Sequence, residues 1–383
     1  MPLFKLKPSF LINSCRVFAI IGCIQAIFGA FLIKQFNKKQ KNPVCDLKDY
    51  AGVTILKPLY GHEPLLEEAL SSFCDQDYPK IQIIFGVQNA NDPAIKVVQE
   101  LQKRYPTKDI DLVIDPTIHG TNLKVSNLIN MAARAKHEIL IISDSDVHAP
   151  NRNFIQNMIA CFSNKKVGLV TSLYAGLPAS MRIIQRLAAA HINYIFLPGV
   201  LIARYLGRQD CLGASSAIKR EVLQQIGGLE SLLNHVADDA ILGQLVRKQG
   251  LHITLAPNIV KTTVYDSDMK FLYQHELRWN RTIKNLEPLG FTFSFLQLPL
   301  FWASLSLLFN PFRYFSWVFF GLCWGIKGIS CRIINRKLHL EHCSIFSLLP
   351  FRDWLSAIIM MNSFRGKHVN WRGKIMKIRN DLR

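Results

Sequence analysis

Motifs that identify several common enzyme classes are missing from this chain of 383 residues. It has no Walker A lysine motif and no G-x-G-x-x-G, so the sequence supports neither an ATPase nor a dehydrogenase. Its nine cysteines include no C-x-x-C pair, so neither a zinc site nor a disulfide framework is indicated. Cys74, Cys161 and Cys211 are therefore expected to be reduced core residues in the cytosol.

Acidic residues are scarce at both ends of the chain. Residues 1–43 contain seven Lys or Arg and no Asp or Glu, and residues 288–383 contain thirteen against three. Residues 44–287 are almost neutral, with twenty-six against twenty-four. Most of the formal net charge of +19 therefore lies beside apolar segments. This pattern favours anchoring at an anionic membrane surface and argues against a nucleic-acid partner.

Long apolar runs account for much of the 49% hydrophobic content. Residues 17–33, 291–309 and 314–330 are predicted to span a membrane, since about 17–25 residues are needed to cross one. Lysines after the first run place its C-terminal end in the cytoplasm. A signal peptide is the weaker alternative, because no small-residue cleavage site follows. The second and third runs are expected to form a membrane hairpin.

Two other apolar stretches contain charges. Residues 343–362 include Arg352 and Asp353, and a full crossing there would place the basic tail outside the cell. A re-entrant or interfacial helix is therefore favoured. Residues 182–206 are interrupted by charges and Pro198, so a helix on the membrane surface and an ordinary buried helix explain them equally well.

These observations predict three regions. Residues 1–43 form a membrane anchor, and residues 44–287 form a cytoplasmic catalytic domain with a membrane-surface helix near 182–206. Residues 288–383 form a membrane hairpin, a re-entrant or interfacial helix and a basic tail.

The first half of the middle region alternates strand and helix patterns. Strands are predicted at 53–59, 81–88, 110–115 and 138–143, and helices at 63–73, 94–104 and 122–135. Short apolar runs separated by helices indicate an α/β fold with a mostly parallel sheet covered by helices on both faces. Ligands of such sheets bind at the carboxyl ends of the strands.

Acidic side chains follow the predicted strands. Asp144 and Asp146 come directly after the strand at 138–143, where two carboxylates can hold a divalent cation that also binds substrate phosphates. Taken alone, this D-x-D is more often a turn or a capping sequence. Asp92 follows the second strand and is expected to cap the next helix, with Pro93 at its first position. A carboxylate that accepts a hydrogen bond from a uracil ring is a second role for it.

Two further groups are candidates for the chemistry. Asp238 and Asp239 begin a helical pattern, where they would act as capping residues, and Asp239 is also a candidate general base. Arg278 could bind a diphosphate through its fork of donors, and Trp279 could form a wall for a sugar or a lipid. An Arg-Trp pair near a membrane is more often an interfacial anchor.

The order of these motifs resembles the family 2 and family 21 glycosyltransferases of the GT-A fold, most closely the ceramide glucosyltransferase-like group. The likeness runs from about residue 50 to the C-terminus. Its stretches are Ile55-Leu56-Lys57-Pro58-Leu59, Asp77-Tyr78-Pro79, Val87-Gln88, Asp92-Pro93-Ala94-Ile95, Lys166-Val167-Gly168-Leu169-Val170, Gly227-Gly228-Leu229 and Trp371-Arg372-Gly373.

Within this group the chain looks most like the bacterial hopanoid-biosynthesis glycosyltransferases. The stretches 119–131, 143–146 and 275–283 carry that likeness. His275 stands where the wider family has Gln or Arg, which weakens the transfer of detailed donor contacts from the ceramide enzymes. The resemblance implies transfer of N-acetylglucosamine from UDP-N-acetylglucosamine to a bacteriohopanetetrol-type lipid at the bacterial inner membrane, with the catalytic domain in the cytoplasm.

The resemblance also implies roles for individual residues. Asp92, Asp144 and Asp239 correspond to the three aspartates of the family, with Asp146 and Asp238 as their neighbours. Asp144 and Asp146 would hold Mg²⁺ or Mn²⁺. The residues implied in donor binding are Asp92, Lys124, Asn127, Asp144, Arg278 and Trp279.

Other functions remain as alternatives at this point. A ceramide glucosyltransferase that uses UDP-glucose is the nearest. A processive polysaccharide synthase usually needs more spans than this chain offers. A lipid-binding scaffold without activity is disfavoured, because every candidate carboxylate is present.

Overall fold

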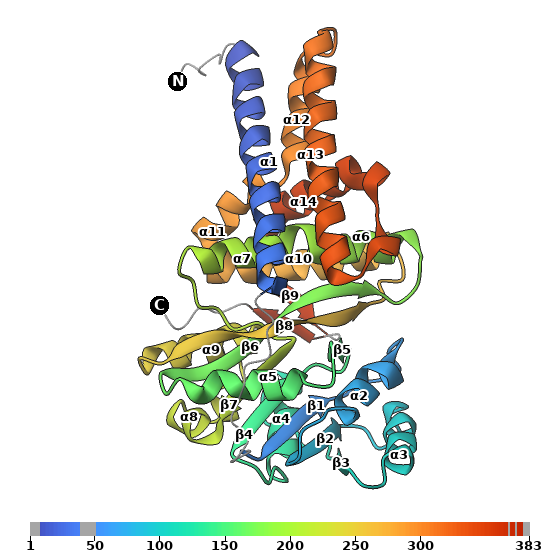
Figure 1. The fold of residues 1–383 in the computed structure, drawn as a ribbon, viewed down its shortest axis with the longest axis vertical. Coiled ribbons are helices and arrows are strands. Elements are labelled where there is room, and N and C mark those ends of the chain that lie inside the picture. The colour runs from blue at the N-terminus through green and yellow to red at the C-terminus, as the bar shows by residue number, and fades with distance from the viewer. Residues whose placement is uncertain (1–7, 39–50, 367, 372–373, 378–383) are drawn as a thin grey trace. The chain divides into compact units, whose positions relative to one another are not determined.

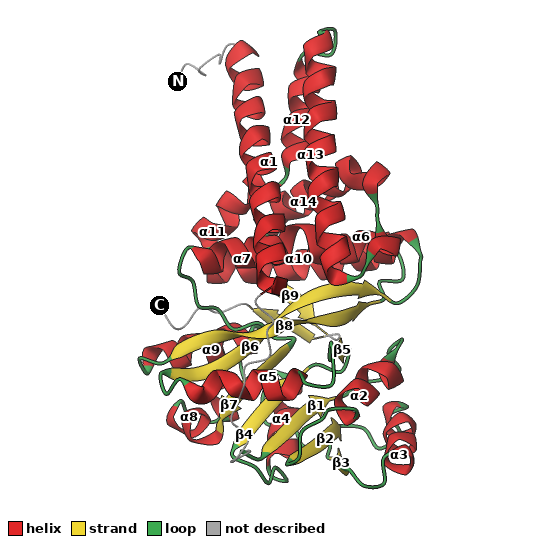
Figure 2. Cartoon of the chain, viewed as in Figure 1, coloured by secondary structure: helices red, strands yellow, loops and turns green. Residues whose placement is uncertain are grey.

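The computed structural model describes residues 8–38, 51–366, 368–371 and 374–377. The chain forms two compact units, which we call the sheet unit and the helical unit. The sheet unit comprises Lys39–Ala179 and Gly207–Thr263, and the helical unit comprises Met1–Lys38, Ser180–Leu206 and Val264–Arg383. Figures 1 and 2 show the helices and strands of each unit. The domain boundaries expected from the sequence, at 43/44 and 287/288, remain a prediction.

A mixed sheet organises the sheet unit. Its eight strands have the order β3-β2-β1-β4-β7-β6-β8-β5. The strands are β1 (Val53–Pro58), β2 (Ile81–Val87), β3 (Asp109–Ile114), β4 (Ile139–Ser143), β5 (Val147–His148), β6 (Val167–Pro178), β7 (Ser215–Lys219) and β8 (His252–Val264). The helices are α2 (Leu66–Cys74), α3 (Ala94–Arg104), α4 (Leu123–Ala132), α5 (Phe154–Ala160), α8 (Arg220–Gln225) and α9 (Asp238–Lys248).

The first half of this unit matches the pattern predicted from the sequence. The four strands β1 to β4 lie where apolar runs predicted them and pair in parallel, with Leu56 of β1 opposite Ile84 of β2 and Ile142 of β4. Val53, Ile55 and Ile141 are fully buried in the core of this unit. Helix α4 packs against β1 and β2 (Figure 1). The carboxyl ends of β1, β2 and β4 therefore form one edge.

The second half pairs in the opposite sense. β7 runs antiparallel to β4 and to β6, and β5 runs antiparallel to β8. These antiparallel pairs make the sheet mixed. The sequence analysis predicted no strands in this half. The β4–β7 pair is closed by Ser143 opposite Ser215, directly before Asp144. Antiparallel pairing thus brings the segment before β7 to the turn that follows β4.

Helices form most of the helical unit. They are α1 (Pro8–Lys38), α6 (Ile183–His191), α7 (Leu197–Tyr205), α10 (Met269–Leu286), α11 (Pro288–Phe293), α12 (Pro299–Phe309), α13 (Tyr314–Leu338) and α14 (Leu349–Ser363), with the short strands β9 (His368–Trp371) and β10 (Lys374–Lys377). Helices α1, α12 and α13 pack against one another (Figure 1). Short 3₁₀ turns and one π-helical turn, Ile192–Phe196, connect several of the elements in both units.

Three helices within the described residues are long and apolar enough to cross a membrane: Ser9–Phe36, Ile183–Tyr205 and Tyr314–Leu338. The first and third contain the predicted spans 17–33 and 314–330. The predicted span 291–309 is instead divided into Pro288–Gln297 and Pro299–Phe309, which are bent by 63°. Pro299 begins the second piece, consistent with its lack of an N–H donor. Apolar composition alone gave no sign of this bend.

Helix α14 buries the charges that were noted in the sequence. It has 15 residues, fewer than the roughly 17–25 that a crossing needs. Arg352 and Asp353 are each 1% exposed, and Arg352 pairs with Glu276 of α10 at 2.9 and 2.5 Å. The placement of α14 as a re-entrant or interfacial helix stays a prediction.

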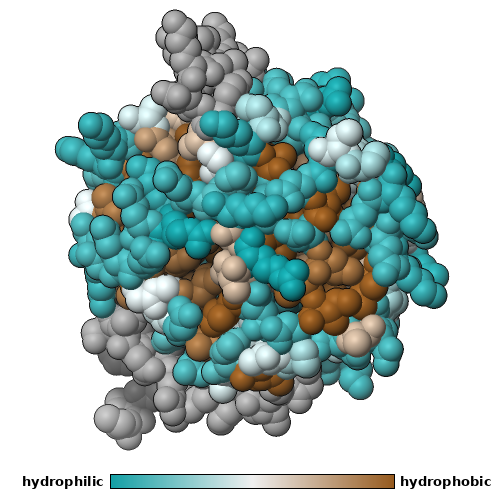
Figure 3. All heavy atoms as spheres, turned by 90° about the horizontal axis from the view of Figure 1, so that it is seen from below, coloured by the Kyte–Doolittle hydropathy of each residue, from teal (hydrophilic) through white to brown (hydrophobic). Residues whose placement is uncertain are grey.

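The one face seen in Figure 3 is mostly hydrophilic, with hydrophobic residues in smaller patches. By contrast, the long helices of the helical unit expose large apolar side chains, such as Phe31 of α1, Leu308 of α12 and Trp317 of α13. Large exposed apolar side chains on long helices are typical of a surface that contacts lipid.

Candidate active site

A tight turn after β4 carries the D-x-D motif. The Val147 N–H donates to the Asp144 carbonyl at 3.3 Å, which closes the turn around Ser145 and Asp146. The Asp144 N–H donates to the carbonyl of Ala214, in the segment before β7, at 3.1 Å. The Asp146 carboxylate accepts a hydrogen bond from the Thr262 hydroxyl of β8 at 2.7 Å. The segment before β7 and strand β8 thus hold this turn.

Lys124 connects this turn to α9. Its ammonium nitrogen lies 2.6 Å from Asp144 Oδ1 and 3.5 Å from Asp238 Oδ2. Burial lowers the pKa of Lys124, but Asp144 and Asp238 outweigh that effect and hold the pKa above its usual range. Lys124 is therefore charged, and it brings two carboxylates that are far apart in the sequence to one place.

The N-terminus of α4 explains how Lys124 reaches both partners. Asn122 caps this helix by accepting from the Val125 N–H at 3.2 Å. The same side chain donates to the carbonyl of His235 at 2.9 Å, and the Asn122 N–H donates to the carbonyl of Leu233 at 2.8 Å. The segment that leads into α9 is thus tied to the first turn of α4.

Asp238 and Asp239 form the first turn of α9. The positive end of a helix dipole stabilises carboxylates there. Burial nevertheless raises the pKa of Asp239 to about 6, and the neighbouring Asp238 and Asp144 add to the rise. The Asp239 carboxylate accepts from the Ala240 N–H at 2.8 Å through one oxygen. A carboxylate with this pKa is suited to accept a proton near neutral pH.

Negative charge is concentrated around the turn. Burial raises the pKa of Asp146 to about 7, with further contributions from Asp144 and Glu63. Burial also raises the pKa of Tyr174 on β6, and Asp239, Asp144 and Asp146 raise it further. Electrostatic interactions thus link Asp239 with Asp144, and Asp144 with Asp146. We call Lys124, Asp144, Asp146, Asp238 and Asp239 the acidic cluster.

Asp92 acts on the loop after β1. Its two carboxylate oxygens accept from the Gly61 N–H at 3.1 and 2.9 Å, and one of them also accepts from the Ala94 N–H at 2.9 Å. The contact with Ala94 confirms the capping interaction that was expected at the start of α3. The predicted contact of Asp92 with uracil remains untested.

Asn127 faces the sheet. It is 4% exposed, and its amide donates to the carbonyl of Gly86 on β2 at 2.8 Å. In the described part of the chain, no hydrogen-bond partner is found for its Oδ1. Its hydrogen bond to β2 does not join Asn127 to the acidic cluster, and its part in donor binding stays a prediction.

Arg278 and Trp279 lie on α10, in the helical unit. The rings of His275 and Trp279 meet edge to face, with centroids 4.5 Å apart. His275 Nδ1 lies 3.1 Å from Asp266 Oδ1. The roles of Arg278 and Trp279 in donor binding likewise remain predictions.

Sequence reasoning assigned no role to several residues beside the cluster. No sequence motif marks the three residues that approach its carboxylates, which are Thr262, Tyr174 and Gly213. Antiparallel pairing of strands brings their segments to the site. Lys57 did carry a signal: it is the one charge in the otherwise uncharged strand pattern at 53–59. A lysine at such a position is almost never fully buried without partners.

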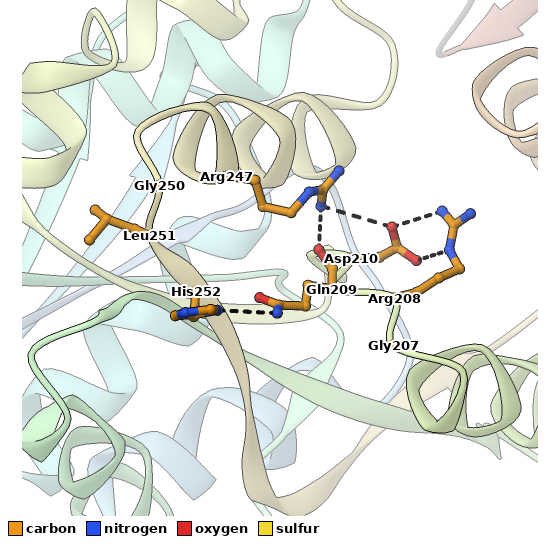
Figure 4. A pocket seen from close by; sticks show the side chains of 8 residues that line it. All are labelled: Gly207, Arg208, Gln209, Asp210, Arg247, Gly250, Leu251 and His252. Carbon is orange, nitrogen blue, oxygen red and sulfur yellow. Dashed lines mark hydrogen bonds and ion pairs between the residues drawn. The ribbon is translucent and has the colours of Figure 1, made fainter.

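A separate pocket of about 410 Å³ lies elsewhere in the sheet unit, lined by Gly207, Arg208, Gln209, Asp210, Arg247, Gly250, Leu251 and His252 (Figure 4). Arg208 pairs with Asp210 at 2.8 and 2.9 Å, and Arg247 contacts the carbonyl of Gln209. Its lining contains none of the described residues of the acidic cluster.

The donor set at the turn suits a hard divalent cation. Within the described residues, no group of three or more His, Cys, Asp or Glu side chains is arranged to hold a metal ion. Asp144 and Asp146 alone supply two carboxylates, and the crowding of negative charge that raises the pKa of Asp146 is what a cation would relieve. Mg²⁺ is commonly held by one or two carboxylates and by substrate phosphates.

Comparison with known proteins gives a family match over nearly the whole chain. The model of glycosyl transferase family 21 matches residues 15–383. Over 136 residues the chain is 38% identical to ceramide glucosyltransferase of Komagataella phaffii, covering 34% of this chain and 26% of that protein. Over 210 residues it is 26% identical to ceramide glucosyltransferase 3 of Caenorhabditis elegans, covering 52% of this chain and 43% of that protein.

The matches thus span about a quarter to less than half of the length of these curated relatives. Among solved structures, a mannosyltransferase, PcManGT from Pyrobaculum calidifontis in complex with GDP-Man and Mn²⁺, superposes with a TM-score of 0.53 at 15% identity. The superposition covers 92% of this chain and 99% of that chain. This likeness shows a shared GT-A-like fold, as the sequence predicted.

Proposed function

Because the chain belongs to glycosyl transferase family 21, we propose that it transfers one sugar from a nucleotide-diphosphate sugar to the hydroxyl group of a membrane lipid. The acidic cluster carries this proposal. It combines a carboxylate pair suited to a cation with Asp239, whose pKa of about 6 suits a base. The long apolar helices support a lipid as the acceptor.

In the proposed reaction Asp239 is the general base. The acceptor hydroxyl oxygen attacks the anomeric carbon, the bond from that carbon to the diphosphate oxygen breaks, and the nucleoside diphosphate leaves. Asp239 takes the proton of the hydroxyl. One candidate base and no obvious second nucleophile favour a single displacement, which inverts the anomeric configuration.

Asp144 and Asp146 would hold Mg²⁺ or Mn²⁺, and such an ion stabilises the charge that develops on the leaving diphosphate. The mannosyltransferase with the similar fold was solved with Mn²⁺, which supports the choice of cation. Lys124 would place a second positive charge beside the diphosphate. Its ammonium group lies 2.6 Å from Asp144, one of the two carboxylates that would hold the ion.

The remaining donor contacts extend the proposal. Asp92 would accept from the uracil ring, and Asn127 would steady the donor from α4. Arg278 would bind the diphosphate through its fork of donors, and Trp279 would line the sugar or lipid path. His275 stands where the wider family has Gln or Arg, and this difference favours the hopanoid branch over the ceramide enzymes.

We propose UDP-N-acetylglucosamine and a bacteriohopanetetrol-type lipid as the substrates, on the strength of the sequence likeness to hopanoid enzymes. The curated relatives favour a second pair, UDP-glucose and ceramide, because both are named ceramide glucosyltransferases. The proposed location is the bacterial inner membrane with the sheet unit in the cytoplasm. The lysines that follow the first apolar run support that orientation.

A transfer assay with the purified full-length chain in detergent tests the proposal. Each radiolabelled UDP-sugar is offered with each lipid in Mn²⁺, and products are identified by mass spectrometry. We expect one sugar per lipid, with the preferred pair identifying the branch. Longer sugar chains would indicate a processive synthase, and neither transfer nor hydrolysis of any UDP-sugar would indicate a non-catalytic scaffold.

A further inference from the structure

Lys57 has an unusual position at the end of β1. Its side chain is 0% exposed, although it carries an ammonium group. Leu56 pairs with Ile142 on β4, so Lys57 lies beside Ser143, the last residue before the D-x-D turn. Transferring a charged group from water to the interior costs free energy unless partners compensate for it. The hydrogen-bond partners of Lys57 therefore indicate its role.

Among the residues that the structure describes, its hydrogen bonds all go to the D-x-D turn and to the strand that leads into it. The ammonium nitrogen donates to the carbonyl of Asp144 at 2.8 Å, to the carbonyl of Val147 at 3.3 Å and to the Ser143 hydroxyl at 3.5 Å. An ammonium group has three donors, so these contacts use its full capacity. It also lies 3.9 Å from the ring centre of Phe73.

We propose that Lys57 is a positioning residue that fixes the turn between Asp144 and Val147, and so aims the Asp144 and Asp146 carboxylates at the metal and diphosphate. This inference rests on the proposed function. Asp144 and Val147 are the two ends of the turn, and one ammonium group holds both of their carbonyls. Asp146 lies between them, so its direction depends on that clamp.

Charge supports the same assignment. Burial lowers the pKa of Lys57 to about 7, while Asp146, Asp144 and Glu63 act to raise it. The ammonium nitrogen of Lys57 thus reaches the turn from β1, whereas that of Lys124 reaches it from α4. A side chain that only filled space would need neither the charge nor the three donors, and methionine would replace it.

The test compares Lys57→Met with the wild-type full-length chain in detergent. UDP affinity is measured by calorimetry with and without Mn²⁺. Loss of a residue that orients metal ligands typically weakens metal affinity or activity by about 10–100-fold. We therefore expect Lys57→Met to weaken UDP binding in Mn²⁺ by that factor, and to change metal-free binding little.

Thr54→Val is the matched control on the same strand. Thr54 is also 0% exposed and bonds Gln82 at 2.9 Å, but it lies at the opposite end of β1 from the turn. We expect this variant to lower the melting temperature without changing Mn²⁺-dependent UDP affinity. Equal losses of affinity in both variants would reduce Lys57 to a structural residue and overturn the inference.

Two outcomes separate the inference from the proposed function. Wild-type Mn²⁺-dependent UDP binding that Lys57→Met retains in full overturns the positioning role alone. Absence of any UDP binding by the wild type overturns the proposed function, and the inference with it. If Lys57→Met does not fold, Lys57→Gln is measured in the same way. Its amide keeps two N–H donors without the charge, and unchanged Mn²⁺-dependent affinity again overturns the role.

Discussion

Gly213 leaves room for the carboxylate of Asp239. It lies in the segment before β7, and a Cβ at this position would be 2.9 Å from Asp239 Oδ2. That is closer than such atoms pack, and the carboxylate is the end of a short side chain that can turn away. The missing side chain of one residue thus helps to set the direction of another.

We therefore predict that Gly213→Ala turns the Asp239 carboxylate and lowers the transfer rate by about 100-fold, the scale of a misplacement of roughly 1 Å. The melting temperature should change little, because a side-chain tip moves rather than backbone. Gly321→Ala on α13 is the control, since a Cβ there meets nothing within 4 Å. A Gly213→Ala enzyme with the full rate would show that the direction of Asp239 is unimportant.

Single residues also show how far sequence reasoning reached. Asp144, Asp146, Asp238 and Asp239 were predicted as candidates, and the structure brings all four together in one unit. The salt bridges of Lys124 to two of them could not be predicted, because they depend on the Asn122 contacts between α4 and the segment before α9. Their catalytic roles remain proposals.

At the scale of elements, helix α14 is held by a buried ion pair. Arg352 donates to both oxygens of Glu276 on α10 and to the hydroxyl of Ser356 at 2.9 Å. It also donates to the Leu187 carbonyl on α6 at 3.4 Å. One guanidinium group therefore joins three helices, including α10, which carries Arg278 and Trp279.

We predict that Arg352→Met lowers the free energy of unfolding of the full chain in detergent by about 3–5 kcal/mol, because it leaves the Glu276 carboxylate buried without its partner. Denaturant titration measures the loss. The double variant Arg352→Met with Glu276→Gln removes both charges and should recover most of the stability. A double variant as unstable as the single one would show that Arg352 acts by packing alone.

Elements with strong local patterns were predictable, and those fixed by distant partners were not. The parallel strands β1 to β4 are short apolar runs, so their sequence identifies them. The strands β6 and β8 have 12 and 13 residues and were missed, because their place depends on pairing with segments far along the chain. The 63° bend at Leu298 was missed because hydropathy reports composition and not direction.

At the scale of the whole molecule, charge is distributed unevenly between the two units. The basic excess lies in residues 1–43 and 288–383, and the helical unit contains most of both ranges. The acidic cluster of the sheet unit lies within residues 44–287, which are almost neutral overall. That distribution is consistent with the proposed enzyme, whose polar site would lie on the sheet and whose apolar helices would contact lipid. The choice of sugar and of acceptor lipid depends on the shape of the binding pocket. The order of motifs along the sequence does not predict that shape.

The central claim is that Asp239, within the acidic cluster, removes the proton of the acceptor. The pH dependence of turnover, measured for the wild type and for Asp239→Asn at saturating substrates, tests it most directly. Since burial raises the pKa of Asp239 to about 6, the carboxylate is protonated below that pH and cannot act as a base. We predict that wild-type turnover falls as the pH drops through about 6. Asp239→Asn should be slower by about 10²–10⁴-fold and lack that step. An Asp239→Asn enzyme with the wild-type rate and pH profile would contradict the account.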